Sequence, residues 1–301
     1  MNRILRRAAL ALITTAGFGA SHLMAAPFAV ELTDDATTLA QAILGGGISI
    51  VGTPTLSSQP GQSGSFTNFS SGPFVQSNGK PGQINIASGV LLTTGIASGA
   101  EGNYMGGPNA DVFGSGDPQL DALSGANTFD ASILTIQFTT ADPFLLLRYA
   151  FASAEYPASI GTFSDVFGIF VNGTNVALVP GTAMPVSINT VNADVNADRF
   201  TQYSTPATPF NYGGITTLLT ARANVSTNSV NTIRIAIADS IDGSVDSAVF
   251  IQGGSLAAPV PEPATVLLLP AGGVFVAALI ALRRRATNPV AAQSGSLRPV
   301  A

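Results

Sequence analysis

The chain has 301 residues, a formal net charge of −5 and no cysteine, which excludes disulfides, thiolate metal sites and cysteine nucleophiles. Its only histidine, His22, lies in a segment expected to be removed, so the mature protein can build neither a Ser-His-Asp mechanism nor an ordinary zinc site. All 17 acidic residues lie between Glu31 and Glu262, where only five basic residues occur, and 5 − 17 gives a charge of −12. Such a surface lacks the basic footprint that nucleic acid requires.

The first 26 residues have the three parts of a secretory signal peptide. Residues 2–7 are basic, residues 8–20 are apolar, and residues 21–26 are mostly small. The apolar part is too short to span a bilayer. We therefore expect export through the Sec machinery and cleavage after Ala26.

One helix and several short strands are expected in the first half of the chain. Thr33-Asp34-Asp35 can cap a helix over 36–44, which the three glycines at 45–47 end. The apolar face of this helix would consist of Leu32, Leu39 and Ile43. Strands are expected at 48–51, near 66–69 within a loop-like stretch 52–82, and at 84–92 with a break at Ser88-Gly89. The polar stretch 97–128 is too long for an ordinary connection, which predicts a functional or mobile loop.

The run from Phe144 to Gly173 is the part around which the rest is expected to be organised. Apolar residues on both sides of the alternation over 144–152 predict a strand that is covered on both faces or central in its sheet. The pattern breaks before Pro157 and resumes over 165–171, where Asn172-Gly173 predicts a hairpin turn.

Further strands and the absence of any fixed repeat define the expected fold. We expect strands at 129–138, 176–179, 186–191, 215–219 and 233–237, and the domain closes with the segment 239–251. Short strands with glycine-rich turns and a single N-terminal helix predict a mainly β domain over 27–258. Its expected architecture is a jelly-roll-like β-sandwich.

Two groups of carboxylates are candidate binding residues. Glu155 and Asp165 fall on or beside the loop between two expected core strands, where such side chains either cap the loop or bind a cation. Asp239, Asp242 and Asp246 are spaced D-x-x-D-G-x-x-D, a spacing compatible with a calcium site to which Glu155 or Asp165 could add a ligand. The alternative is turn capping by the aspartate side chains.

The central run resembles the signature of a bacterial surface domain, choice-of-anchor L, whose usual form is F-A-S-E-E-Y followed by F-N-D-V-F-G-F-F-L-N-G. The shared residues are Phe151, Ala152, Ser153, Glu155, Tyr156, Phe163, Asp165, Val166, Phe167, Gly168, Phe170, Asn172 and Gly173. The chain departs from the form at Ala154 and Ser164. Further blocks resemble the domain in the same order, at 39–47, 88–95, 120–123, 237–239 and 246–250. The resemblance spans roughly residues 33–255 and implies the fold and a surface location.

A separate signal is expected over 259–285. Pro261-Glu262-Pro263 precedes an uncharged stretch, Ala264 to Leu282, whose nineteen residues are long enough for a transmembrane helix. Arg283, Arg284 and Arg285 follow, and they place residues 286–301 as a short cytoplasmic tail. This order resembles a PEP-CTERM sorting signal. The resemblance implies recognition by exosortase in an exopolysaccharide-producing Gram-negative bacterium, and a helix that is only transiently in the inner membrane.

Together these features predict an exported, non-enzymatic protein of the cell surface or extracellular matrix. The resemblances imply a role in adhesion or biofilm, with exopolysaccharide as a partner. The alternatives are a secreted glycan-binding module and a glycoside hydrolase that uses two carboxylates, such as Glu155 with Asp165 or Asp239. The absence of tryptophan argues against a sugar-gripping cleft.

Overall fold

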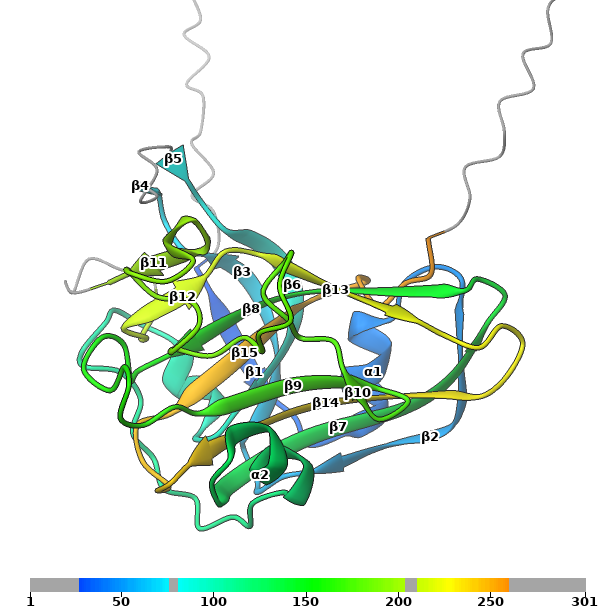
Figure 1. Cartoon of the computed structure of the whole chain (residues 1–301), viewed down its shortest axis with the longest axis horizontal. Coiled ribbons are helices and arrows are strands. Elements are labelled where there is room, and N and C mark those ends of the chain that lie inside the picture. The colour runs from blue at the N-terminus through cyan, green and yellow to red at the C-terminus, as the bar shows by residue number, and fades with distance from the viewer. Residues whose placement is uncertain (1–26, 76–80, 204–209, 260–301) are drawn as a thin grey trace, which may run out of the picture. The chain divides into compact units, whose positions relative to one another are not determined.

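The computed structural model describes residues 27–75, 81–203 and 210–259, which form two antiparallel sheets packed face to face (Figure 1). The smaller sheet has the strand order β10-β9-β14-β7-β2. Its strands are β2 (Ile48–Ser57), β7 (Thr128–Thr140), β9 (Val166–Val171), β10 (Thr174–Asn175) and β14 (Asn231–Ser240). The mainly β architecture predicted from the sequence is confirmed.

The larger sheet has the order β1-β3-β6-β15-β8-β12-β11, and β13 pairs with the same edge of β8 as β12. Its strands are β1 (Ala29–Leu32), β3 (Ser63–Ser70), β6 (Asn85–Thr93), β8 (Phe144–Ser153), β11 (Phe200–Gln202), β12 (Gly214–Thr216), β13 (Leu219–Asn224) and β15 (Ser247–Gln252). A separate pair is formed by β4 (Phe74–Val75) and β5 (Pro81–Gly82).

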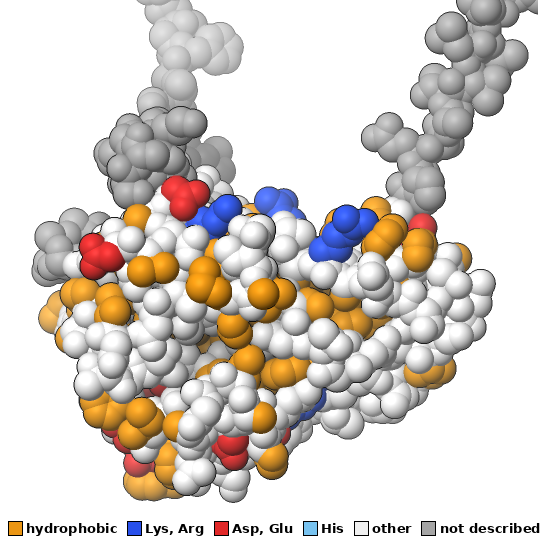
Figure 2. Space-filling view, in the orientation of Figure 1, with side chains coloured by type: hydrophobic (Ala, Val, Ile, Leu, Met, Phe, Trp, Pro, Cys, Tyr) orange, Lys and Arg blue, Asp and Glu red, His pale blue; other side chains and the backbone are white. Residues whose placement is uncertain are grey.

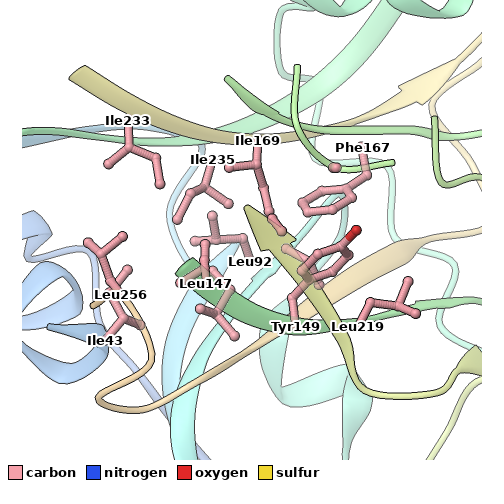
Figure 3. Packing of buried hydrophobic residues seen from close by; sticks show 14 of the residues in the cluster. Ile43, Leu92, Leu147, Tyr149, Phe167, Ile169, Leu219, Ile233, Ile235 and Leu256 are labelled. Atoms are coloured by element: carbon pink, nitrogen blue, oxygen red, sulfur yellow. The ribbon is translucent and has the colours of Figure 1, made fainter. Parts of the chain in front are cut away.

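The core lies between the two sheets and follows the alternation of β8 and β9. Leu147 and Tyr149 of β8 point toward Phe167 and Ile169 of β9, and all four side chains are at most 1% exposed (Figure 3). The β8 strand is paired on both edges, as predicted for the organising strand. Asn172 and Gly173 both have positive φ, at 50° and 86°, which confirms the predicted hairpin turn between β9 and β10.

Two α-helices occupy different sides of the sandwich. Helix α1 (Ala36–Ile43) is N-capped by Asp35, whose side chain accepts a hydrogen bond from the Thr37 amide. The helix contacts both sheets. Its expected face is confirmed for Leu39 and Ile43 but is wrong for Leu32, which is 47% exposed because it belongs to β1. Helix α2 (Pro118–Ser124) covers the outer face of the smaller sheet. Two short 3₁₀ helices are η1 (Ala97–Ala100) and η2 (Ala197–Arg199).

Several expected strand boundaries are wrong. Residues 176–179 and 186–191 form no strands, and an isolated Leu178–Pro185 bridge is their only ladder contact within the described ranges. Prolines interrupt the hydrogen-bonding ladder there. The apolar side chains of both segments are nevertheless buried in the core. The expected break at Ser88-Gly89 is absent, since β6 runs straight through it. The stretch 52–82, expected to be mostly loop, contains the second half of β2 and all of β3.

The expected signal peptide, sorting signal, transmembrane helix and cytoplasmic tail lie outside the described residues. Within the ranges that are described, no helix is long and apolar enough to cross a membrane. The described residues belong to one compact unit.

Candidate functional site

The interior of the sandwich changes from apolar to polar at one end. On six strands, the side chains that face inward are apolar along most of the strand and polar at or just beyond its end. The polar positions are Thr94, Ser132, Ser153, Asp165, Asp239 and Ser247, and we refer to them as the polar layer.

Strand register places these positions at the same end. Ser247 is paired with Ser153, and Ser132 is paired with Ile237, two residues before Asp239. The Ser247 hydroxyl also donates to Asp165 Oδ2 at 2.6 Å, which joins the two sheets.

Every acid that is buried in the described part of the chain lies at or beside this layer. Asp130, Glu155, Asp165, Asp239 and Asp246 are at most 3% exposed, and we refer to them as the acid cluster. Burial of a carboxylate is costly unless hydrogen bonds or an opposite charge compensate for the lost hydration. The partners of each carboxylate therefore decide what this end of the molecule can do.

Glu155 and Asp165 are satisfied by local donors. The Asp165 amide donates to Glu155 Oε2 at 3.1 Å, which fixes the two acids relative to each other. The Ser240 amide donates to Asp165 Oδ1 at 3.3 Å, in addition to the bond from Ser247. These two carboxylates are thus built into the end of the sandwich.

Asp130 and Asp246 are held by the segment that precedes α2. The Ala110 amide donates to Asp246 Oδ1 at 3.0 Å, and the Val112 amide donates to Asp130 Oδ2 at 3.1 Å. The Gly114 amide also donates to Asp130. Every second amide over 110–114 therefore donates to the acid cluster. These hydrogen bonds fix the path of this part of the long polar stretch 97–128.

Asp239 is different from the other four acids. Neither of its carboxylate oxygens has a hydrogen-bond partner among the described residues, although its side chain is 0% exposed. Asp246 Oδ2 is likewise buried without a partner. An ideal Cβ at Gly95 would lie 1.8 Å from Asp246 Oδ2. Any side chain at position 95 would therefore clash with the Asp246 carboxylate, and glycine leaves the space that it occupies.

Basic side chains do not neutralise the acid cluster. Arg234 forms an ion pair with Asp117, the only ion pair found within the described ranges. The other arginines of these ranges, Arg148, Arg199 and Arg222, make no hydrogen bond to a cluster acid, and Arg222 stacks on a phenylalanine ring elsewhere. In Figure 2 the basic side chains of the visible face lie mainly along its upper edge, and acidic ones lie both at the upper left and at the lower left beside α2.

The environment shifts the titration of the whole cluster in one direction. Burial raises the pKa of Glu155 to about 7, that of Asp246 to about 6 and that of Asp239 to about 9. Burial also raises the pKa of Asp130, and it raises the pKa of Asp165 well above its ordinary value. Neighbouring acids add to each of these shifts, and the nearby Thr94 hydroxyl opposes the shift of the Asp239 pKa.

Backbone strain is concentrated at the same end. Eight residues other than glycine have positive φ, and four of them are asparagines, which tolerate this conformation. The remaining four are Phe113, Asp130, Ile241 and Val245, with φ between 50° and 82°. All four belong to, or adjoin, segments that carry the cluster acids or donate to them, where such strain is typical of functional sites.

A cavity of about 330 Å³ opens beside Asp165. The polar side chains around it are mainly hydroxyls and amides. Besides Asp165, they are Ser124, Thr162, Ser164, Ser187, Asn189, Thr190 and Ser240. The cavity is thus suited to a small polar ligand.

The structure unites most of the candidate residues predicted from the sequence. Glu155, Asp165, Asp239 and Asp246 enter one cluster, whereas Asp242 is exposed and its Oδ1 caps the Ser244 amide at 3.2 Å. In the described ranges, no three or more acidic, histidine or cysteine side chains are arranged to hold a metal ion among themselves. The calcium site expected from the D-x-x-D-G-x-x-D spacing therefore stays a prediction.

Asp130 was not among the predicted site residues. The inward alternation of Leu134 and Ile136, continued backward through Ser132, reaches Asp130 and could have identified it. The proposed sorting residues Pro261, Glu262, Pro263, Arg283, Arg284 and Arg285 lie outside the described residues.

The fold and this site define a two-sheet β domain with a buried, uncompensated acidic end. The family model for the Choice-of-anchor L domain matches residues 30–257, and the chain belongs to this family. Comparison with curated proteins gave no match. Membership of the family indicates a surface-anchored protein at the cell surface or outside the cell, and the family is not known as enzymatic.

Proposed function

We propose that this chain is an exported, non-enzymatic protein of the cell surface or extracellular matrix that exosortase sorts through its C-terminal signal. The observation that carries the proposal is the order of features along the chain. The family match covers residues 30–257, and Pro261-Glu262-Pro263, the apolar stretch and three arginines come after it. The Sec machinery exports the chain, the apolar stretch holds an inner-membrane intermediate, and cleavage near the Pro-Glu-Pro releases the folded unit. The host is a Gram-negative bacterium whose exopolysaccharide matrix or biofilm receives the product.

Burial of the acid cluster supports a non-enzymatic role. A glycoside hydrolase needs two carboxylates that flank a bound glycosidic bond. Glu155 and Asp239, two of the carboxylates considered for that role, are only 3% and 0% exposed. A polysaccharide chain therefore has no direct access to the pair.

Sorting is tested by removing the acid of the Pro-Glu-Pro motif. We expect Glu262→Ala to leave a longer, membrane-retained protein, because exosortase no longer recognises the motif while the apolar stretch still partitions into lipid. Cell fractionation and immunoblotting measure the shift, and Glu31→Ala, a change of an exposed acid in β1, is the control. Release of Glu262→Ala to the surface at the control's size and level would contradict the proposal.

Glycan binding is a second candidate function, favoured by the cavity of about 330 Å³ with its hydroxyl and amide lining. Such groups match the hydroxyls of a sugar, and this volume is within the range of small-ligand sites. Binding of the purified protein to a glycan array tests this function. Ser164→Trp, which fills the cavity, should weaken binding at least about tenfold, whereas Ser229→Trp in an exposed turn should not. No binding, or equal binding by both variants, excludes the cavity as a glycan site.

A further inference from the structure

The unpartnered oxygen atoms of the protein are concentrated in the polar end of the interior. Among the described residues, eight buried side-chain nitrogen or oxygen atoms lack a hydrogen-bond partner. Four of the eight belong to this end, namely both carboxylate oxygens of Asp239, Asp246 Oδ2 and the Ser132 hydroxyl. All four are oxygen atoms, and two acids supply three of them.

Protonation alone does not account for this arrangement. A proton on Asp239 removes the charge, but the carboxylic acid is still buried, and the nearby Thr94 hydroxyl is the one polar side chain that lowers its pKa by interacting with it. A buried polar group without hydrogen-bond partners destabilises the folded state, in comparison with one whose hydrogen bonds are satisfied. Arginine does not compensate either, since none in the described ranges is bonded to the cluster. The missing partner must bring positive charge and accept several oxygen ligands.

We propose that the polar end of the sandwich binds a calcium ion, with Asp239 and Asp246 as its anionic ligands. The donors at this end are oxygens, with neither histidine nor cysteine in the described ranges, so the donor set fits a hard cation rather than zinc. Calcium accepts carboxylate, carbonyl, hydroxyl and water oxygens in flexible geometry, whereas magnesium demands a near-ideal octahedron.

Two carboxylates completed by neutral oxygens give a weak site. Three acids are not arranged to hold a metal among themselves here, which excludes the tight, carboxylate-rich class of site. Extracellular calcium modules bind at about 10⁻⁴–10⁻³ M, and a site of this strength suits the exported protein proposed above. The Ser132 hydroxyl, whose residue is register-paired two positions before Asp239, is the neutral side-chain oxygen that the structure offers without a partner.

The ion would join three separate parts of the chain. Asp239 ends β14, Asp246 precedes β15, and Asp246 also accepts the Ala110 amide of the segment before α2. Calcium would therefore relieve repulsion within the cluster and fix the β14–β15 turn to that segment. The site gives the folded unit additional stability in a calcium-containing medium outside the cell.

Thermal unfolding of the purified full-length protein tests the site. Against EDTA, 10 mM calcium chloride should raise the melting temperature by about 3 °C or more, and magnesium at equal ionic strength should raise it much less. Asp239→Asn and Asp246→Asn should lose the calcium response, yet be at least as stable as the wild type in EDTA, because asparagine has a similar shape and cannot ionise in the buried site. Asp194→Asn, an exposed acid without a side-chain hydrogen bond in the described ranges, should keep the full response.

Terbium provides a test that does not depend on how the variants fold. The chain has five tyrosines and no tryptophan, and the Tyr212 pKa is raised mainly by burial and further by Asp246 and Asp239, so this ring is near the site. Tyrosine-sensitised terbium luminescence should appear with the wild type and be displaced by millimolar calcium. The proposal is overturned if calcium leaves the wild-type melting temperature unchanged, or if both asparagine variants keep the calcium response. It is also overturned if both variants lose the response and are much less stable than the wild type in EDTA.

Discussion

Replacing Phe167 by alanine is expected to destabilise the protein by about 3–5 kcal/mol, the usual cost of truncating a buried phenylalanine. The Phe167 ring is 0% exposed and lies between the sheets, 5.1 Å from the Tyr149 ring and 6.2 Å from the Phe151 ring, measured between centroids. The opposing strand β8 is paired on both edges, so it cannot move in to fill the cavity.

Chemical denaturation of both proteins measures this difference. Phe113→Ala is the matched control, since that phenylalanine is 86% exposed and its loss should change the free energy of unfolding by less than about 0.5 kcal/mol. A loss below about 1 kcal/mol for Phe167→Ala would mean that the strand expected to organise the core is peripheral.

In the presence of a chelator, the stability of the wild type should fall as the pH rises from about 5 to about 8. Burial raises the pKa of Glu155 from 4.5 to about 7, and nearby Asp242 raises it further, while the Asp165 amide opposes the shift. The folded state therefore binds a proton that the unfolded state has already released. The resulting stability is fully present below the unfolded pKa and is lost as the pH rises through about 7.

The expected loss attributable to Glu155 is on the order of 3 kcal/mol, at 1.36 kcal/mol for each pKa unit. Glu155→Gln should flatten this dependence, because glutamine keeps an acceptor for the Asp165 amide but does not ionise. Glu31→Gln, at an exposed position of β1, should retain the wild-type profile. Unfolding curves at several pH values decide the matter, and parallel profiles for Glu155→Gln and the wild type would show that Glu155 does not titrate in this range.

Alternation along the chain was sufficient to predict the central strands and the layer architecture. Strands β8, β9 and β14 have inward stripes of large apolar residues, which only a buried sheet face accommodates. The same rule failed at 176–191, where apolar residues are buried in the core although the segment forms no long strand. Pro180 and Pro185 have no amide hydrogen to donate to a strand ladder, and apolar spacing does not reveal this.

The candidate site was predictable only in part, because strand pairing assembles it. Spacing along the chain grouped Asp239, Asp242 and Asp246, and β15 does bring Asp246 beside the polar layer, yet Asp242 faces solvent. A register shift in β14 between Ile237 and Asp239 changes the partner of Asp239 on β7. Asp130 continues the inward alternation of β7, but its positive φ of 50° is a backbone feature that the alternation does not show.

The C-terminus of the protein recovered from the cell surface tests the proposed sorting most directly. Intact-mass and peptide mass spectrometry should find that surface material from an exosortase-bearing host ends near Pro261-Glu262-Pro263 and lacks the sequence from about residue 264 onward. Recovery of peptides from the Arg283–Ala301 tail on surface material would contradict sorting by cleavage and indicate a permanent membrane anchor.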